Sequence, residues 1–322
     1  MIKLSALNKV LYCALLLMSL TLQGKAQEYK NEFGFKSDND SYLWYGQDRY
    51  YTNGLFINFR RAINQQKLGN KLEKLTYEMT AAQKMYNPIS GYSPQKEQQD
   101  RPFAAYLYGA VNVNLLYKNE SALKTGLEIG TLGPDALGKE AQELLHKIVG
   151  FYEVKGWEYQ IKSTTAVNLT AQYMRLLHRS EDQKTDFSFE GYGNLGTIFS
   201  GAGVGILFRA GAINQLFNSA YTNTVLSHNS KTPKLVKNEL FFYAKPQLNY
   251  IAYDATIEGS MFNHNSPVTF GVKPWVFAQQ IGFNYSTPRF TLDYHLIFKS
   301  REVKSTAKPH QYGSISMYYR FN

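Results

Sequence analysis

The sequence has almost no cysteine and, beyond its first 26 residues, no long apolar run. The one cysteine, Cys13, lies in the N-terminal leader, so the chain that follows has no disulfide, thiol nucleophile or cysteine metal site. No later stretch reaches the ~18 apolar residues that a membrane-spanning helix needs. The pattern Gly-x-Ser-x-Gly is also missing, and no serine has an obvious histidine and acid nearby in the sequence, so a serine nucleophile has weak support.

The leader itself has the pattern of a signal peptide. Lys3 and Lys9 are followed by an apolar run, and Ala26 is a small residue at a suitable cleavage point. We expect residues 1–26 to be removed, leaving one domain over 27–322. Loss of three lysines and no acid lowers the formal net charge from +10 to +7. In an exported protein this favours an anionic lipid surface over nucleic acid as partner, although a cationic solvated surface is also consistent with it.

What is abundant is alternation between apolar and polar residues, with 25 tyrosines and 20 phenylalanines. Segments of roughly ten residues carry Leu, Ile, Phe or Tyr on one face and Asn, Gln, Lys, Glu or Gly on the other. The predicted strands are 28–37, 50–62, 75–86, 103–117, 122–131, 157–178, 186–199, 202–211, 239–253, 275–286, 289–300 and 311–321. An even number of strands and an aromatic-ended last strand predict an all-β fold, a closed antiparallel transmembrane β-barrel of about 12 strands in the outer membrane. A soluble β-sandwich or a lipocalin-type barrel is the alternative.

One segment, 133–150, breaks the β pattern and predicts a short amphipathic helix in a rim loop. Pro134 stands in its first turn, apolar residues follow at helical spacing, and Gly150 ends it. Gln142 and His146 are four residues apart, so they project from one face. A lone histidine on a helix is usually a surface or packing residue. A helix that places Gln and His at a barrel rim favours a functional role instead.

The first loop is the second unusual feature, because residues 37–54 read SDNDSYLWYGQDRYYTNG. Such a stretch is consistent with a polar hairpin loop. It also offers oxygen ligands for a hard cation, with Asp40 as the central carboxylate. The stretch lacks the Gly at the sixth place and the Glu at the twelfth that an EF-hand requires, so we expect weak calcium affinity with much of the shell from water and lipid oxygens.

Five blocks together resemble the outer-membrane lipid A deacylase family, the lipid A 3'-O-deacylases. They are DNDSYLWYGQDRYYTNG (38–54), RPFAAYLY (101–108), GTLGPDALGKEAQELLHKIVGFYEVKGWEYQ (130–160), YDATIEGSMF (253–262) and HQYGSISMYYRF (310–321). They stand in the family's order and span nearly the whole mature chain. Two motifs depart from the family pattern. The usual Arg-Pro-Tyr-Ala-Gly has Phe103 for Tyr and Ala105 for Gly, and the usual Tyr-Thr-Pro has Asn87 for Thr. These changes bear on substrate fit more than on chemistry.

The resemblance implies a calcium-dependent (Ca2+) esterase that removes the 3'-linked acyloxyacyl group of lipid A, the lipid anchor of lipopolysaccharide, in the outer leaflet. The positions that match the family are Asn39, Asp40, Thr52, Gln142 and His146. For the basic pair that holds lipid phosphate, position alone suggests Lys84 and Arg101. The expected partners are lipid A and outer-membrane lipids, with a monomer favoured.

The chemistry can also be argued from the residues alone. Ester hydrolysis needs an activated water and a stabiliser for the oxyanion. Histidine is the residue type whose ring titrates near neutrality, so the His146 side chain is a candidate to take a proton from water. A cation beside Asp40 would polarise the ester carbonyl. Two other functions stay open at this point: a non-enzymatic outer-membrane pore, and a serine-dependent barrel phospholipase or acyltransferase.

Overall fold

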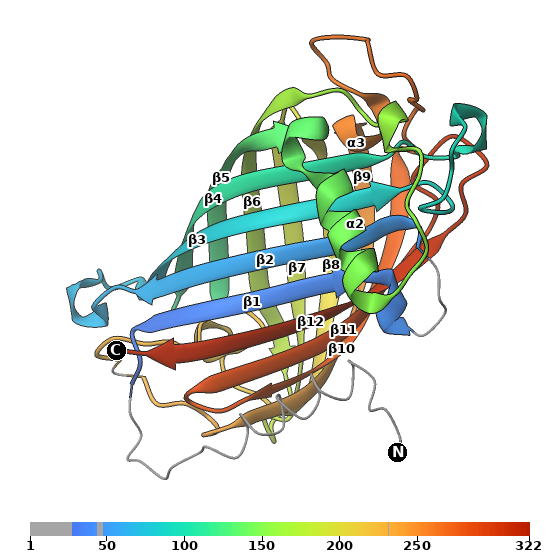
Figure 1. The fold of residues 1–322 in the computed structure, drawn as a ribbon. Coiled ribbons are helices and arrows are strands. Elements are labelled where there is room, and N and C mark those ends of the chain that lie inside the picture. The colour runs from blue at the N-terminus through green and yellow to red at the C-terminus, as the bar shows by residue number, and fades with distance from the viewer. Residues whose placement is uncertain (1–27, 44–47, 231) are drawn as a thin grey trace, which may run out of the picture.

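The structure is a computed structural model that describes residues 28–43, 48–230 and 232–322. The predicted signal peptide over 1–26, with Cys13, lies outside the described residues. Within them, twelve antiparallel strands close into one barrel (Figure 1). Each strand pairs with its neighbours in sequence, and β1 pairs with β12 to complete the ring. The predicted all-β, closed and antiparallel fold is therefore confirmed.

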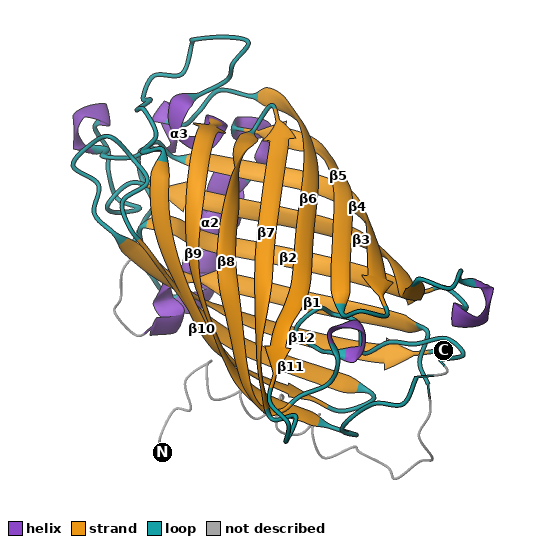
Figure 2. Ribbon diagram, turned by 180° about the vertical axis from the view of Figure 1, so that it is seen from behind, coloured by secondary structure: helices purple, strands orange, loops and turns teal. Residues whose placement is uncertain are grey.

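The strands are β1 (Asn31–Asn39), β2 (Tyr50–Ala62), β3 (Leu72–Asn87), β4 (Ala104–Tyr117), β5 (Ser121–Leu132), β6 (Thr164–Arg179), β7 (Thr185–Gly196), β8 (Phe199–Ala212), β9 (Glu239–Asp254), β10 (Trp275–Ser286), β11 (Phe290–Lys299) and β12 (His310–Phe321). Two α-helices are described, α2 (Gly138–Val149) and the single turn α3 (Ala255–Glu258). Short 3-10 turns are η1 (Asp40–Leu43), η2 (Gln65–Lys67), η3 (Lys96–Gln98), η4 (Pro134–Ala136), η5 (Trp157–Tyr159) and η6 (Leu216–Asn218). Figure 2 shows the barrel from behind, with the helices confined to loops.

Two predicted boundaries were wrong, both beside the helix. The helix predicted over 133–150 is divided, because Leu137 has φ +56° and separates η4 from α2. The carbonyl of Ala136 accepts a hydrogen bond from Gln83 on β3, which ties the short turn to the barrel wall. The strand predicted from residue 157 begins only at Thr164. Trp157 instead begins the short 3-10 turn η5, and its ring packs against Phe103. Among the described residues no helix is long and apolar enough to cross a membrane.

Alternation along the strands separates an apolar outside from a polar inside. On β1, Phe33 and Phe35 are exposed while Glu32 is buried. The outward apolar side chains are 37% to 69% exposed on the strands, which is the arrangement of a lipid-facing band. Inside, Arg60 pairs with Glu32 at 2.7 Å and also with Glu78. Burial of these charges inside the barrel depends on such pairing.

The end of the barrel where β1 begins and β12 ends is filled by the described residues of the segment between β8 and β9, 213–230 and 232–238. Leu216 and Phe217 of this segment are buried in an apolar cluster with residues of the strands. Lys74 Nζ on β3 donates to Asn218 Oδ1 at 2.9 Å and to the carbonyl of Thr224 at 2.5 Å. This segment forms part of the floor of a polar cavity of about 570 Å³.

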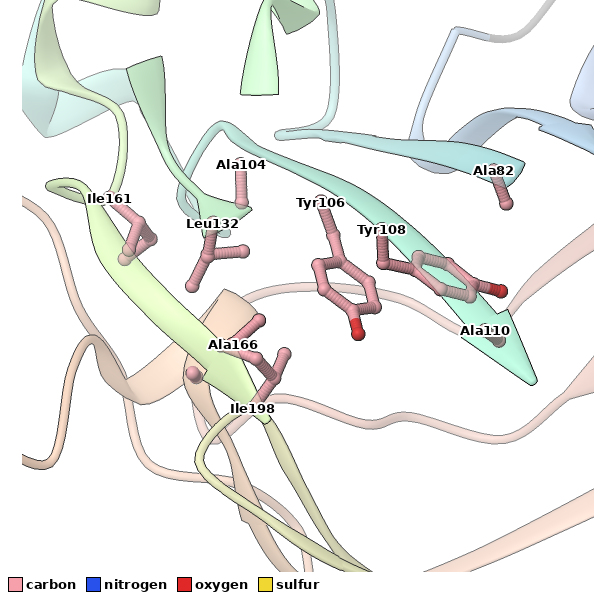
Figure 3. Packing of buried hydrophobic residues seen from close by; sticks show 10 residues of the cluster. Ala82, Ala104, Tyr106, Tyr108, Ala110, Leu132, Ile161, Ala166 and Ile198 are labelled. Atoms are coloured by element: carbon pink, nitrogen blue, oxygen red, sulfur yellow. The ribbon is translucent and has the colours of Figure 1, made fainter. Parts of the chain in front are cut away.

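The opposite end, called the distal rim below, carries a second apolar cluster that points into the barrel. Tyr106 and Tyr108 of β4 stack with their centroids 4.5 Å apart (Figure 3). Leu132 at the end of β5 and Ile161 and Ile198 in the loops pack in the same cluster. This packing fixes the ends of β4 and β5, from which the helix-bearing loop begins.

Candidate active site

Helix α2 presents polar side chains to the outer wall of the barrel. Its buried residues are Gly138, Gln142 and His146, which follow one another at intervals of four residues and so lie on one face. The helix lies across β3 and β4 on the outside (Figure 1). Gly138 permits this close approach, because a Cβ there would collide with Ala105 of β4 and lie 2.7 Å from the Trp157 ring.

Apolar residues of the helix point the other way. Leu144 and Ile148 are 60% and 68% exposed, and Phe151 just after the helix is 58% exposed. These residues form one stripe at helical spacing. An apolar stripe turned away from the protein is expected of a helix whose outer side contacts lipid. The polar residues of α2 therefore lie between the barrel wall and the lipid.

The carboxylate of Asp48, in the first loop, is the centre of the polar contacts beneath the helix. Its Oδ1 accepts hydrogen bonds from Thr52 Oγ1 at 2.5 Å and from Asn87 Nδ2 at 2.9 Å. Its Oδ2 accepts from Gln142 Nε2 at 3.2 Å and from the Tyr152 hydroxyl. Four donors from β2, β3, α2 and the segment after α2 thus meet at one carboxylate.

His146 is held in one tautomer by the segment that follows α2. Its Nδ1 lies 2.8 Å from the backbone carbonyl oxygen of Tyr152. A carbonyl oxygen only accepts, so Nδ1 carries the proton and Nε2 of the neutral ring has a free lone pair. Nε2 lies 3.6 Å from Asp48 Oδ2. A proton taken up at Nε2 would therefore be stabilised by the adjacent carboxylate.

The amide of Gln142 is oriented by Trp157. Trp157 Nε1 donates to Gln142 Oε1 at 2.8 Å, which leaves the amide nitrogen to face Asp48. The indole is fully buried and packs against Phe103 with ring centroids 5.0 Å apart. This buried contact fixes which end of the Gln142 side chain donates.

A β-bulge directs Thr52 into the same group. Between Tyr51 and Asn53 the register of β2 with β3 shifts, so Thr52 is an extra residue in the pairing. Bulges bend the strand and redirect a side chain, and they are common beside active sites. The Thr52 hydroxyl lies 2.5 Å from Asp48 Oδ1 and 3.5 Å from Asp40 Oδ1. One hydroxyl thus lies between two carboxylates.

Asp40 is the carboxylate that the sequence singled out for a cation. Burial raises its pKa to about 8, and the nearby charge of Asp48 adds to the shift. The Arg49 backbone N–H donates to its Oδ2 at 2.7 Å and works against the shift. Among the described residues, no lysine, arginine or histidine side chain lies within 4.0 Å of the Asp40 carboxylate.

This donor set fits a hard divalent cation. Carboxylate and hydroxyl oxygens are the ligands such ions prefer, and a bound cation would remove the repulsion between Asp40 and Asp48. The described residues contain no group of three His, Cys, Asp or Glu side chains placed to hold a metal. Asp40, Asp48 and Thr52 would therefore supply only part of a coordination shell.

Asn39 supports the loop from one side. Its side-chain Oδ1 accepts from the backbone N–H of Ser41 at 2.7 Å, which turns the chain at Asp40. Tyr42 anchors the turn on the last strands: its carbonyl accepts from the Tyr294 hydroxyl of β11 at 3.2 Å, and its side chain packs on Gly313 of β12. Asn39 lies next to the polar group, and its side chain contacts the backbone of the turn.

Lys84 and Arg101 are placed elsewhere. Gln83 points outward from β3 toward α2, whereas Lys84 points inward and lines a cavity inside the barrel together with Arg101. The structure therefore brings together Asp40, Thr52, Gln142 and His146, but not these two cations. Contact of Lys84 and Arg101 with a substrate phosphate stays a prediction.

Sequence reasoning missed several members of the group. Asp48 lies within the quoted polar stretch, yet nothing in the stretch distinguishes it from Asp40. Tyr152 lies in the segment after α2, and Asn87 is the last residue of β3. Gly91 is equally hidden: its N–H donates to the Tyr152 hydroxyl at 3.2 Å, and a Cβ there would collide with the Asp48 carboxylate. Trp157 lies in the block 130–160 that resembles the family, but the sequence alone assigns no role to its indole.

Comparison with known proteins agrees with this fold. A family model described as outer membrane protein LpxR matches residues 10–321. LpxR from Salmonella typhimurium is similar in structure, with a TM-score of 0.72 and 19% identity over 90% of this chain and 100% of that chain. The β domain of the Bordetella autotransporter BrkA has a TM-score of 0.50 and 8% identity, covering 92% of this chain and 100% of that one. No curated protein matches.

The two structural matches, at these identities, show a shared barrel fold. The family match is more specific, because it extends over nearly the whole chain and agrees with the blocks that suggested lipid A deacylases. The predicted outer-membrane location is confirmed as well. The chain belongs to the LpxR family of outer membrane proteins, the lipid A deacylase family that its sequence resembles.

Proposed function

We propose that this protein hydrolyses the 3'-linked acyloxyacyl ester of lipid A in a calcium-dependent reaction, within the outer leaflet of the outer membrane. The observation that carries the proposal is the meeting of His146, Gln142, Asp48 and Thr52 between an outward-apolar helix and the lipid-facing wall. A lipid ester can reach such a site sideways from the bilayer. A soluble substrate in the barrel interior would face the other side of the wall.

His146 is the general base in this proposal. With Nδ1 donating to the Tyr152 carbonyl, Nε2 is free to take a proton from the water that attacks the ester. Asp48, 3.6 Å away, stabilises the imidazolium that forms. The same proton is then available to the leaving alkoxide, so one ring serves as base and acid.

Oxyanion stabilisation comes from the donors around Asp48 and from the cation. The Gln142 amide, the Thr52 hydroxyl and the Gly91 N–H are polar donors at the group, and small shifts on substrate binding would turn them toward the developing charge. Asp40, Asp48 and Thr52 would hold Ca²⁺, with the rest of the shell from water and lipid oxygens. When bound, the ion polarises the ester carbonyl.

The test is mass spectrometry of lipid A from cells with and without the expressed protein. We expect loss of the 3'-linked acyloxyacyl group with the wild type and unchanged lipid A with His146→Asn, each at equal expression and with heat-modifiable gel migration. Lipid A that is unchanged by a correctly folded wild type would contradict the proposal. Full 3'-deacylation by the His146→Asn protein would refute the role of the base.

The pore alternative is less well supported. The described residues of the segment between β8 and β9 occupy the end of the barrel where β1 begins and β12 ends, and Tyr221 donates from its hydroxyl to Glu190 of the lumen at 3.1 Å. A bilayer conductance measurement would show stable open channels if this segment left a path. The serine alternative also has little support, because no serine hydroxyl is hydrogen-bonded to a histidine ring in the described part of the chain.

A further inference from the structure

A separate cavity lies inside the barrel near the distal rim, on the other side of the wall from His146. It has a volume of about 340 Å³. This cavity is called the rim chamber below. The residues that line it include Lys84, Arg101, Tyr86, Tyr192, Phe199 and Tyr253. Four cations and three carboxylates contribute to it. Aromatic walls with a few charged groups are typical of small-molecule sites.

Most cations of the barrel interior have a carboxylate partner. The pairs and their N···O distances are Arg60–Glu32 at 2.7 Å, Lys124–Glu78 at 2.7 Å, Lys245–Glu190 at 2.5 Å, Arg209–Asp186 at 2.6 Å, Lys36–Asp38 at 3.3 Å and Lys299–Glu302 at 2.7 Å. Lys84 and Arg101 differ, since neither has a carboxylate within 4.0 Å among the described residues. Lys74, at the other end of the barrel, also lacks a carboxylate, but its ammonium group donates to Asn218 and Thr224. Lys84 and Arg101 are therefore the cations of the rim chamber that have no carboxylate partner among the described residues.

Lys84 is surrounded by aromatic rings. Its Nζ lies 5.3 Å from the ring centroid of Tyr108, 5.5 Å from Phe199, 5.9 Å from Tyr106 and 6.0 Å from Phe56. These rings hold the ammonium group through cation–π attraction and leave it without a counter-charge. The side chain is only half-buried, so its charge is accessible from the chamber.

The Arg101 side chain is held in place by two contacts, but one of its N–H donor groups has no acceptor. Its guanidinium stacks over Tyr86 at 4.3 Å, and Nη2 donates to Thr256 Oγ1 at 2.8 Å. The Nη1 group is buried and has no hydrogen-bond partner. The charges of Asp254 and Glu302 act on Arg101 without an ion pair, and both carboxylates have other partners: Asp254 accepts from the N–H and hydroxyl of Thr256 at 2.9 and 2.6 Å, and Glu302 pairs with Lys299. A buried donor without an acceptor carries a cost that an anionic ligand would remove.

We propose that the rim chamber binds an anionic sugar, with Lys84 and Arg101 holding its phosphate or carboxylate and the tyrosine rings contacting the sugar. A planar guanidinium and a lysine point charge are the side chains that recognise such groups. The sugar has two possible sources, which share this chemistry: the saccharide attached to a membrane lipid at the rim, or a free sugar phosphate. The binding itself does not rest on the proposed deacylation.

Calorimetry on detergent-refolded protein tests the binding, with glucose 6-phosphate, glucose and inorganic phosphate as probes. We expect glucose 6-phosphate to bind at least ~10-fold more tightly than either of the others, because only it engages both the cations and the rings. The double variant Lys84→Met with Arg101→Gln should lose at least ~10-fold in affinity. Lys245→Met is the matched control, since it removes an interior lysine that is already paired with Glu190.

Kinetics distinguish the two sources. If the sugar belongs to the lipid, the double variant should raise KM for lipopolysaccharide that carries its sugars but not for lipid A stripped of them. Glucose 6-phosphate should then compete only with the first substrate. If the ligand is a free sugar phosphate, binding should be lost in the double variant while both KM values stay unchanged. Either pattern supports the chamber.

Three results would overturn the proposal. Equal affinity for glucose and glucose 6-phosphate would remove the role of the cations. Equal affinity for inorganic phosphate and glucose 6-phosphate would remove the role of the rings. An equal loss of binding in Lys245→Met would show general electrostatic attraction by the interior, since that lysine lies outside the rim chamber lining. Each variant must first show the heat-modifiable migration of a closed barrel, with Arg101→Lys as a milder replacement for a chain that fails to fold.

Discussion

Replacing Asp48 by Asn is the sharpest perturbation of the proposed mechanism, because it removes one charge and keeps the shape of the side chain. The carboxylate lies 3.6 Å from His146 Nε2, and the two side chains are 15% and 7% exposed. Asp48 has two proposed roles, to stabilise the imidazolium and to help hold Ca²⁺, and saturating calcium isolates the first. The substitution should therefore act on the chemical step while the ester still binds.

The magnitude follows from the distance and the burial. Two unit charges about 4 Å apart attract by about 1 kcal/mol in water and by about 4 kcal/mol at an effective dielectric constant of 20. The low exposure of both side chains favours the upper half of this range. Since each 1.36 kcal/mol in the barrier is tenfold in rate, kcat should fall by about 10²-fold to 10³-fold.

The assay is single-substrate kinetics on lipid A in mixed micelles at saturating calcium. We expect a lower kcat with little change in KM, and unchanged heat-modifiable migration, because Asp48 lies outside the strand ladder. Glu143→Gln is the control: this carboxylate is on α2 but exposed, with Lys139 as its partner at 3.8 Å. A full kcat in Asp48→Asn would refute the argument, and so would an equal loss in the control.

Three further predictions concern the metal, the close approach and the lipid contact. Asp40→Ala should move the calcium concentration for half-maximal activity upward, with rescue at high calcium, and chelator should silence the wild type reversibly; activity that persists in chelator would exclude the metal role. Gly91→Ala should lower activity at least ~10-fold with the barrel intact, since the added methyl collides with the Asp48 carboxylate; unchanged kinetics would show that this space is not used. Leu144→Asp with Ile148→Asp should reduce activity on lipid A in vesicles more than in detergent micelles; equal loss in both would contradict lipid contact by the exposed stripe.

The barrel could be predicted from the sequence because each strand carries its own evidence. A period of two with aromatic residues is a local signal, and it specified twelve strands whose bounds agree with the structure to within a few residues except beside the helix. The exceptions at Leu137 and Trp157 arise from tertiary contacts. Leu137 takes a left-handed conformation where η4 is tied to Gln83, and Trp157 is withdrawn from the strand to bind Gln142. The residues next to Leu137 and Trp157 in the sequence give no sign of these partners, Gln83 and Gln142.

The site was predictable only in part. His146 and Gln142 could be paired by their helical spacing, but their partner depends on how the first loop folds, and Asp48 rather than Asp40 makes the direct contacts. Lys84 shows a signal that was available: on β3 the residues before and after it point outward, so parity places Lys84 inside the barrel. Proximity to the rim in sequence does not say which side of the wall a side chain faces.

The turn that carries Asp40 rests on Tyr42, which is held by β11 and β12, while Asp48 is held from β3 and α2. The first and last strands must therefore pair with each other before the two carboxylates and His146 lie side by side. Under the proposed mechanism, hydrolysis is in this way conditional on closure of the barrel between β1 and β12. By the same reasoning, a chain whose barrel has not yet closed would be inactive toward the lipids that it meets during export.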